Sequence, residues 1–378
     1  MKRINAEKLS ELISAHAQKE LAEHKIGYKE IIIHQEGCRV YHGRFAPDDG
    51  WTPPERPLFR AASMTKPITA AAVAQLADRG LLDLRAPAYN YYPQMKDLQV
   101  ATVENGKIIS LRPAKNVIRV SDLLCHTSGI GCTPVYETLE RSNARLPLCD
   151  AVNEILTHPL SFEPRTAQAY SGTDAFDVAA GIVEQVSGMS FDEFLQKNLF
   201  DPLHMVDTTF RPNEEQWSRM APMHNRTADG SSETAPMPED CVFADFVPER
   251  LSAGAGLAST AEDYIRFAEM LRSGGLSEDG ARVLSEDAVR IMSTPQLPEE
   301  VEMFGERWGL GMRVVVMPDY PHGLGAGCFG WSGAYGTHFW VDPENRISVV
   351  MMKNSLYDGG AGNLSACQLE RDVTAALI

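Results

Sequence analysis

Hydrophobic patterns at both ends of the chain predict a sheet flanked by helices. Apolar residues recur at helical spacing through 6–24, and a closing helix is expected over 365–378. Strand-like apolar runs occupy five segments, namely 31–33, 38–41, 308–317, 330–341 and 346–352. Glu36-Gly37 separates the first two runs, as in a hairpin turn. The two ends are therefore expected to build one antiparallel sheet with the terminal helices against it.

The middle of the chain has helical patterns instead. Apolar residues at helical spacing, preceded by capping residues or followed by glycine, mark three segments, 173–186, 190–199 and 260–273. The simplest assembly is an α/β (α+β) fold in which 1–75 and 250–378 form one domain and 76–249 forms a mostly helical insertion. A small-molecule site is expected where the two lobes meet.

Ser63 and Lys66 stand at the start of a further helix, over 67–80, whose small and apolar residues predict burial on nearly every side. Residues three apart share a helix face, so the hydroxyl and the amine can lie side by side. A lysine in a buried helix is costly unless it is paired or neutral, and a neutral amine can take a proton from an alcohol. The pair predicts hydrolysis or acyl transfer through a serine. The alternative is a helix end that Ser63 caps, with the amine of Lys66 reaching solvent.

The charge and the cysteine content limit which classes of binding partner and which cell compartment are expected. The 378 residues include 35 basic and 51 acidic side chains, for a net charge of −16, which argues against nucleic acids and anionic membranes as partners. Seven cysteines without paired spacing predict free thiols in a reducing compartment. The N-terminus lacks the apolar core of a signal peptide, and no apolar run is long enough to span a bilayer. A cytoplasmic protein is expected.

Segments in a fixed order resemble the serine β-lactamase-like hydrolases, most of all class C β-lactamases and their esterase relatives. The likeness runs from about Tyr28 to Met352. After S-x-x-K, it rests on the segments 123–130, 170–173, 201–205 with Thr208, 252–260, 331–333 and 339–343. The resemblance implies the antiparallel-sheet domain and the all-helical domain described above.

The resemblance also implies roles for single residues. Tyr170 occupies the position of the tyrosine that reaches the nucleophile, and a neighbouring lysine cation favours its phenolate, which can take the Ser63 proton. Lys66 and Tyr170 would share that proton as a unit. The backbone N–H groups of Ser63 and Ala334 would form the oxyanion hole.

Two departures from the family pattern point to neutral esters. Gly172 stands where the family has an asparagine expected to contact the amide of β-lactam substrates. The K-T-G segment reads Trp331-Ser332-Gly333, so an indole replaces the cation that binds a substrate carboxylate. The tryptophan resembles the W-x-G segment of family VIII carboxylesterases. Ser332 could still donate a hydrogen bond, and Gly333 allows a ligand to approach the backbone closely.

A carboxylesterase acting on small neutral esters through Ser63 is therefore the leading hypothesis. The alternatives are a β-lactamase or D-amino-acid peptidase, an acyltransferase, and an inert binding protein of the same fold. His126 is expected in a structural turn, while His322 and His338 could line the site. No metal-ligand spacing or phosphate-binding loop is present, so no metal and no cofactor are expected.

Overall fold

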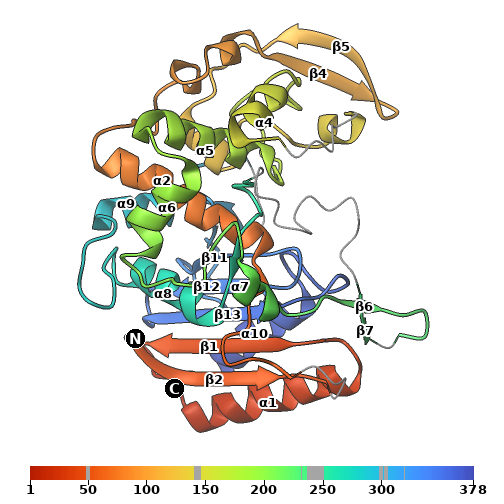
Figure 1. The fold of residues 1–378 in the computed structure, drawn as a ribbon, viewed down its shortest axis with the longest axis vertical. Coiled ribbons are helices and arrows are strands. Elements are labelled where there is room, and N and C mark those ends of the chain that lie inside the picture. The colour runs from red at the N-terminus through yellow and green to blue at the C-terminus, as the bar shows by residue number, and fades with distance from the viewer. Residues whose placement is uncertain are drawn as a thin grey trace.

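A seven-stranded antiparallel sheet is built from both ends of the chain, as the sequence predicts (Figure 1). The computed structural model describes residues 1–47, 52–139, 146–230, 232–235, 251–297, 301, 305–318 and 320–378. The strand order is β2-β1-β13-β12-β11-β10-β9. The strands are β1 (Lys29–Gln35), β2 (Cys38–Phe45), β9 (Glu306–Trp308), β10 (Arg313–Val315), β11 (Phe329–Ser332), β12 (His338–Asp342) and β13 (Ile347–Lys353). Pairing of β1 with β13 joins the two ends of the chain.

Helices cover both faces of this sheet. The terminal helices α1 (Ala6–Ala22) and α10 (Leu364–Ala375) pack on one face, and α8 (Ala261–Arg272) packs on the other. Successive side chains of a strand point to opposite faces. Ile31 and Ile33 accordingly join the core beneath α1 and α10, while Ile32 joins the core on the opposite side. Figure 1 shows the two termini close together, and a backbone bridge links Ile4 to Leu377.

Two of the predicted strands were wrong in extent, because glycine-containing turns divide each of them. The run 308–317 forms β9 and β10, separated by a turn in which Gly309 N–H donates to the Met312 carbonyl. The run 330–341 likewise forms β11 and β12, which are joined by a hairpin loop closed from Gly333 N–H to the Thr337 carbonyl. Apolar alternation alone does not reveal these turns, since the residues around the glycines are also apolar.

The rest of the chain is mostly helical. The remaining helices are α2 (Thr65–Asp78), α3 (Val120–Leu124), α4 (Leu148–Ile155), α5 (Asp174–Ser187), α6 (Phe191–Leu195), α7 (Glu214–Ser218) and α9 (Glu286–Met292). Three small antiparallel pairs join β3 (Phe59–Arg60) to β8 (Ala258–Ser259), β4 (Gln99–Glu104) to β5 (Lys107–Pro113), and β6 (His224–Arg226) to β7 (Ser232–Thr234). Helix α2 crosses the predicted boundary at 75/76, and the division into two domains stays a prediction.

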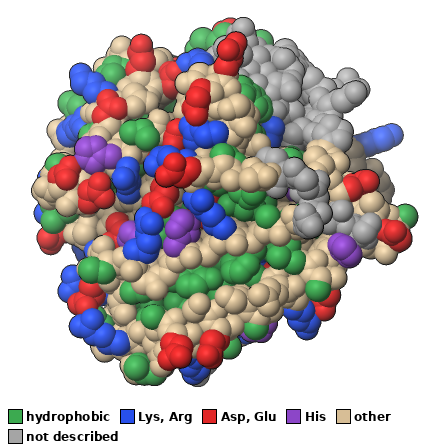
Figure 2. Space-filling view, turned by 60° about the horizontal axis from the view of Figure 1, so that its bottom comes forward, with side chains coloured by type: hydrophobic (Ala, Val, Ile, Leu, Met, Phe, Trp, Pro, Cys, Tyr) green, Lys and Arg blue, Asp and Glu red, His purple; other side chains and the backbone are tan. Residues whose placement is uncertain are grey.

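The surface carries charges of both signs (Figure 2), and the described cysteines form no disulfide bonds. Acidic and basic side chains are interspersed over the face shown in Figure 2. Six cysteines are free, and Cys241 lies outside the described residues. None of the helices formed by the described residues combines the length and the apolarity needed to cross a lipid bilayer.

Candidate active site

Ser63 and Lys66 lie side by side, as their spacing predicts. Ser63 is in a 3₁₀ turn (Ala62–Met64) directly before α2, and Lys66 is in the first turn of that helix. The Lys66 Nζ atom is 3.1 Å from the Ser63 Oγ atom. Ala62 has a φ of +46°, a left-handed conformation that costs a non-glycine residue about 1–3 kcal/mol. The surrounding structure therefore holds the backbone next to Ser63 in a conformation it would not adopt alone.

The amine of Lys66 is fully buried and donates to three acceptors. Besides Ser63 Oγ, these are the backbone carbonyl oxygens of Gly172, at 2.6 Å, and of Gly254, at 2.8 Å. An ammonium group has three N–H donors, so this arrangement satisfies all of them. The carbonyl of Gly172 thus contacts the lysine from the position where the family pattern has an asparagine side chain. Gly254 was not predicted, although it lies in the segment 252–260 that contributes to the family likeness.

Tyr170 contacts the same serine from the other side. Its hydroxyl is 2.8 Å from Ser63 Oγ, and it accepts a hydrogen bond from the indole N–H of Trp331 at 3.2 Å. The Lys66 Nζ atom is 4.8 Å from the centre of the Tyr170 ring. Tyr170 is 38% exposed and Ser63 is half-buried, so reagents from solvent can reach the pair. The structure brings together the three residues predicted to be catalytic and adds Trp331 to them.

The aromatic rings of His126 and Trp308 pack against the ring of Tyr170. The His126 ring centre is 4.6 Å from that of Tyr170 and 4.2 Å from that of Trp308. The His126 Nδ1 atom accepts a hydrogen bond from Ser171 N–H. Burial, reinforced by the charge of Lys66, holds the pKa of His126 well below its usual value. The lowered pKa favours the neutral form of His126, and its purely structural role stays a prediction, whereas Trp308 was anticipated only as part of a strand.

The end of β11 packs tightly against the segment that carries Ser63. A side chain at Gly333 would place its Cβ 2.4 Å from the Ala61 carbonyl oxygen, so only glycine permits this approach. The Thr337 hydroxyl donates to the same carbonyl at 2.9 Å. Ala334, which follows, is exposed. The packing places the Ala334 segment beside the serine, and the assignment of its N–H to the oxyanion hole stays a prediction.

Two residues considered for the site, Ser332 on β11 and His338 on β12, have hydrogen-bond partners within the protein. Ser332 is buried and its hydroxyl is 2.8 Å from His338 Nδ1, so it is engaged with the protein instead of pointing freely into the site. His338 is only 1% exposed and contacts Glu370 of α10, and His322 also lies beside that helix. Because side chains alternate along a strand, Ser332 and His338 point away from the face that Trp331 shares with Tyr170.

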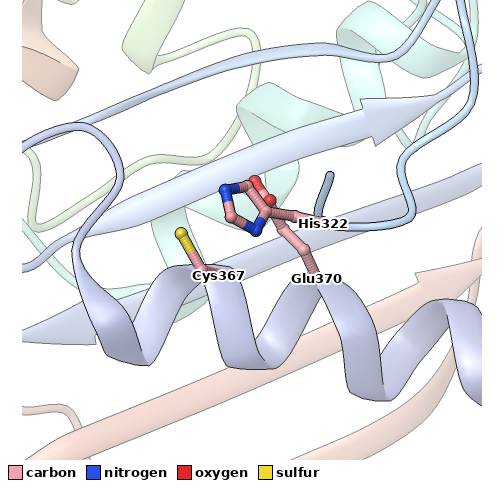
Figure 3. A group of neighbouring side chains, drawn as sticks. All are labelled: His322, Cys367 and Glu370. Carbon is pink, nitrogen blue, oxygen red and sulfur yellow. The ribbon is translucent and has the colours of Figure 1, made fainter. Parts of the chain in front are cut away.

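His322, Cys367 and Glu370 form a cluster that sequence spacing did not reveal (Figure 3). Their nitrogen, sulfur and oxygen atoms lie within 4.8 Å of one another. Arg313 and His338 already hold one oxygen of Glu370, and Arg371 donates to His322 Nδ1. Two guanidinium groups therefore bind one oxygen of Glu370 and one ring nitrogen of His322, whereas Glu370 Oε2 has no hydrogen-bond partner among the described residues. Cys367 and Glu370 are three apart on one helix, which was the available signal, but His322 comes from a distant loop.

Comparisons with known proteins show which family the chain resembles over most of its length. The family model described as Beta-lactamase matches residues 18–366. The esterase EstB of Burkholderia gladioli is 31% identical over 82% of this chain and 81% of its own length. The acyltransferase calJ of Penicillium decumbens is 28% identical over 77% of this chain and 74% of its own.

A solved structure described as "EstCE1, a hydrolase with promiscuous acyltransferase activity" superposes with a TM-score of 0.83, covering 98% of this chain and 99% of that one, at 21% identity. This chain thus shares its fold with that protein. This chain belongs to the beta-lactamase family, which confirms the resemblance recognised in its sequence.

Proposed function

We propose that this protein is a serine carboxylesterase that forms an acyl-enzyme at Ser63 and acts on small neutral esters. The observation that carries the proposal is the set of hydrogen bonds linking Lys66, Ser63, Tyr170 and Trp331. It supplies a nucleophile, a proton acceptor in contact with it, and a donor that stabilises the acceptor when it is negatively charged.

The reaction follows from these contacts. The Ser63 oxygen attacks the ester carbonyl while its proton passes to the coupled Tyr170 and Lys66 pair. The backbone N–H groups of Ser63 and Ala334 stabilise the resulting oxyanion. Collapse of the intermediate breaks the ester C–O bond, and the leaving alkoxide recovers the proton from the pair. Water then attacks the acyl-enzyme by the same steps and releases the acid.

The preference for neutral esters rests on two positions, Trp331 and Gly172. Trp331 places an indole where the family's lysine binds a substrate carboxylate, and its N–H is engaged with Tyr170. Gly172 has no side chain to contact a substrate amide. A substrate carrying a carboxylate next to an amide, such as a penicillin, loses two interactions, whereas a simple ester requires neither. The relative EstB supports this preference, since it is named an esterase.

Acyl transfer to an alcohol is a second candidate. The relative calJ is named an acyltransferase, and EstCE1 is described as a hydrolase that also has acyltransferase activity. The same acyl-enzyme serves both outcomes, and they differ only in whether water or an alcohol attacks it. Adding a short alcohol to an ester assay and quantifying the new ester against free acid measures the partition.

Short-chain nitrophenyl esters and a chromogenic cephalosporin test the esterase proposal. We expect ester hydrolysis in the wild type, its loss in Ser63→Ala, and cephalosporin turnover far below ester turnover. Ser332→Ala is not a suitable control because it alters the strand beside the site. Ser218→Ala is one, since Ser218 is exposed at the end of α7. Equal ester hydrolysis by wild type and Ser63→Ala rules out Ser63 as the nucleophile, and dominant cephalosporin turnover favours the β-lactamase alternative.

A labelling experiment separates an enzyme from an inert binding protein. A phosphonate ester reacts with an activated serine, and the expected product is a mass increase on the peptide containing Ser63. The exposed Ser218 provides an internal comparison in the same digest. Absence of labelling on the Ser63 peptide would contradict the proposed function.

A further inference from the structure

Four buried polar side chains connect the strand beside the nucleophile to the C-terminal helix. Ser332 on β11 bonds to His338 on β12, His338 bonds to Glu370 on α10, and Glu370 bonds to Arg313 on β10. The three separations are 2.8, 3.1 and 2.5 Å. Each of the four residues is at most 5% exposed. We call these residues the polar network.

The direction of each hydrogen bond in the polar network follows from the groups involved. An ionised carboxylate has no proton to donate, so the Nε2 atom of His338 must carry one to bond Glu370. Burial holds the pKa of His338 below its usual value, which favours the neutral ring, and a neutral ring with its proton on Nε2 has a lone pair on Nδ1. The Ser332 hydroxyl must then donate to Nδ1. Its only proton is committed to His338 and is not available to a substrate.

Charged groups around Glu370 stabilise this arrangement through one of its two carboxylate oxygens. Arg313 lies against Glu370 and also contacts Glu306 and Tyr320. The contacts from His338 and Arg313 outweigh burial and keep the pKa of Glu370 below its usual value. His322 and Cys367 flank the same carboxylate (Figure 3). Glu370 therefore stays an acceptor that fixes the His338 ring.

The position of Ser332 connects the polar network to the reaction. Ser332 directly precedes Gly333 and Ala334, and it is paired across the hairpin with His338. Gly333 packs on the Ala61 carbonyl, two residues before Ser63. A shift of Ser332 therefore moves both the Ala334 N–H and the segment that carries the nucleophile.

We propose that His338 is a positioning residue for acyl-enzyme formation, which holds the Ser332–Ala334 segment in place through the Ser332 hydroxyl and is itself oriented by Glu370. The inference rests on the proposed function and deepens it. Because Ser332 cannot donate to a ligand carboxylate, the polar network also adds to the selection of substrates that lack one. Ser332 then contributes to catalysis through its place in the strand, without touching the substrate.

Two substitutions of His338 distinguish its contact with Ser332 from its contact with Glu370. The amide oxygen of His338→Asn takes the place of Nδ1 and can accept from Ser332, whereas His338→Gln places its amide near Nε2 and leaves Ser332 without an acceptor. We expect His338→Gln to lower the rate of Ser63 labelling by a phosphonate about tenfold, in line with partial loss of an oxyanion donor. His338→Asn should restore the rate to within about threefold of wild type, since the Ser332 contact is kept.

The kinetic signature distinguishes positioning from substrate binding. Ser332→Ala and His338→Gln should each lower kcat for a nitrophenyl ester with little change in KM, and the double variant should be no slower than either single one. A rise in KM confined to Ser332→Ala, with additive losses in the double variant, would overturn the proposal in favour of a substrate contact. Equal labelling of His338→Gln and wild type would overturn it as well.

An NMR measurement on the wild type keeps the proposal testable if a variant does not fold. The ¹⁵N shifts of the His338 ring should show a neutral imidazole protonated at Nε2 at pH 7, and protonation at Nδ1 would refute the direction assigned to the Ser332 hydrogen bond. If the proposed function itself is wrong, the phosphonate does not label Ser63 even in the wild type. That outcome differs from a slower labelling confined to His338→Gln.

Discussion

The indole N–H of Trp331 donates to the hydroxyl of Tyr170, with 3.2 Å between the two atoms. The sequence identified this tryptophan only as the replacement for a carboxylate-binding lysine. The structure shows that its polar atom faces the hydroxyl of Tyr170, the residue proposed to accept the Ser63 proton. A neutral donor at this position can stabilise a phenolate without placing a cation beside the substrate.

Trp331→Phe should lower kcat/KM for nitrophenyl esters about tenfold, because a hydrogen bond to a charged group contributes about 1.5–3 kcal/mol. The aromatic packing against Tyr170 is retained in this variant, so protein stability should change little. Steady-state kinetics and thermal unfolding measure the two effects. Trp308→Phe is the matched control, since Trp308 also packs on Trp331. Among the hydrogen bonds of the described residues, the Tyr170 hydroxyl accepts from Trp331 and not from Trp308. Equal losses in both variants would assign the effect to packing.

Gly172→Asn should recreate the family's asparagine and increase reactivity toward β-lactams. A side chain fits here, because a Cβ at Gly172 would meet no atom within 4 Å. We expect faster acylation of Ser63 by a penicillin than in Gly172→Ala, which has the same backbone constraint but no amide. Mass spectrometry of the acyl-enzyme over time measures the rate. Identical rates in the two variants would show that the missing asparagine is not what limits amide recognition.

Gly254→Ala should impair the site through Lys66. A Cβ at Gly254 would lie 2.7 Å from the Thr173 backbone, so the segment must move and its carbonyl must leave the lysine amine. We expect kcat to fall at least about tenfold, as one of three contacts that position the amine is lost. Gly172→Ala is the comparison, because Gly172 also supplies a carbonyl to Lys66 but has room for a methyl group. Full activity of Gly254→Ala would show that this carbonyl is dispensable.

His126→Asn should make the protein more resistant to mild acid. The folded state keeps His126 neutral, with a pKa well below its usual value, whereas the unfolded chain binds a proton as the pH falls through about 6.5. The unfolded state then carries the extra proton, and His126 subtracts up to about 1.4 kcal/mol of stability per pH unit below that value. Asparagine can accept from Ser171 N–H and tolerates the φ of +62° at this position.

Urea unfolding of wild type and His126→Asn between pH 7 and pH 5 measures this difference. The free energy of unfolding should fall less steeply with acid in the variant. His34 and His338 also have lowered pKa values and are unchanged, so they contribute equally to both proteins. Parallel slopes would mean that His126 does not remain neutral in the folded state.

The local part of the site was predictable because it depends on residues close in the sequence. A spacing of three at the start of a helix allows Ser63 and Lys66 to lie side by side, and this relation depends on few other residues. The order of the later segments then identified Tyr170 and Trp331, and the comparisons confirmed the family. Apolar periodicity likewise predicted the terminal helices and the sheet made from both ends of the chain.

The tertiary structure decided the contacts that cross between segments. Backbone carbonyls look alike in any sequence, so nothing identified those of Gly172 and Gly254 as partners of Lys66. Ser332 was expected to face a substrate, but the pleat of β11 turns it toward His338 and the C-terminal helix. The sequence alone predicted the pairing of Ser63 with Lys66 and identified the family. Only the fold could decide where each donor points, because that depends on residues far apart in the chain that pack together.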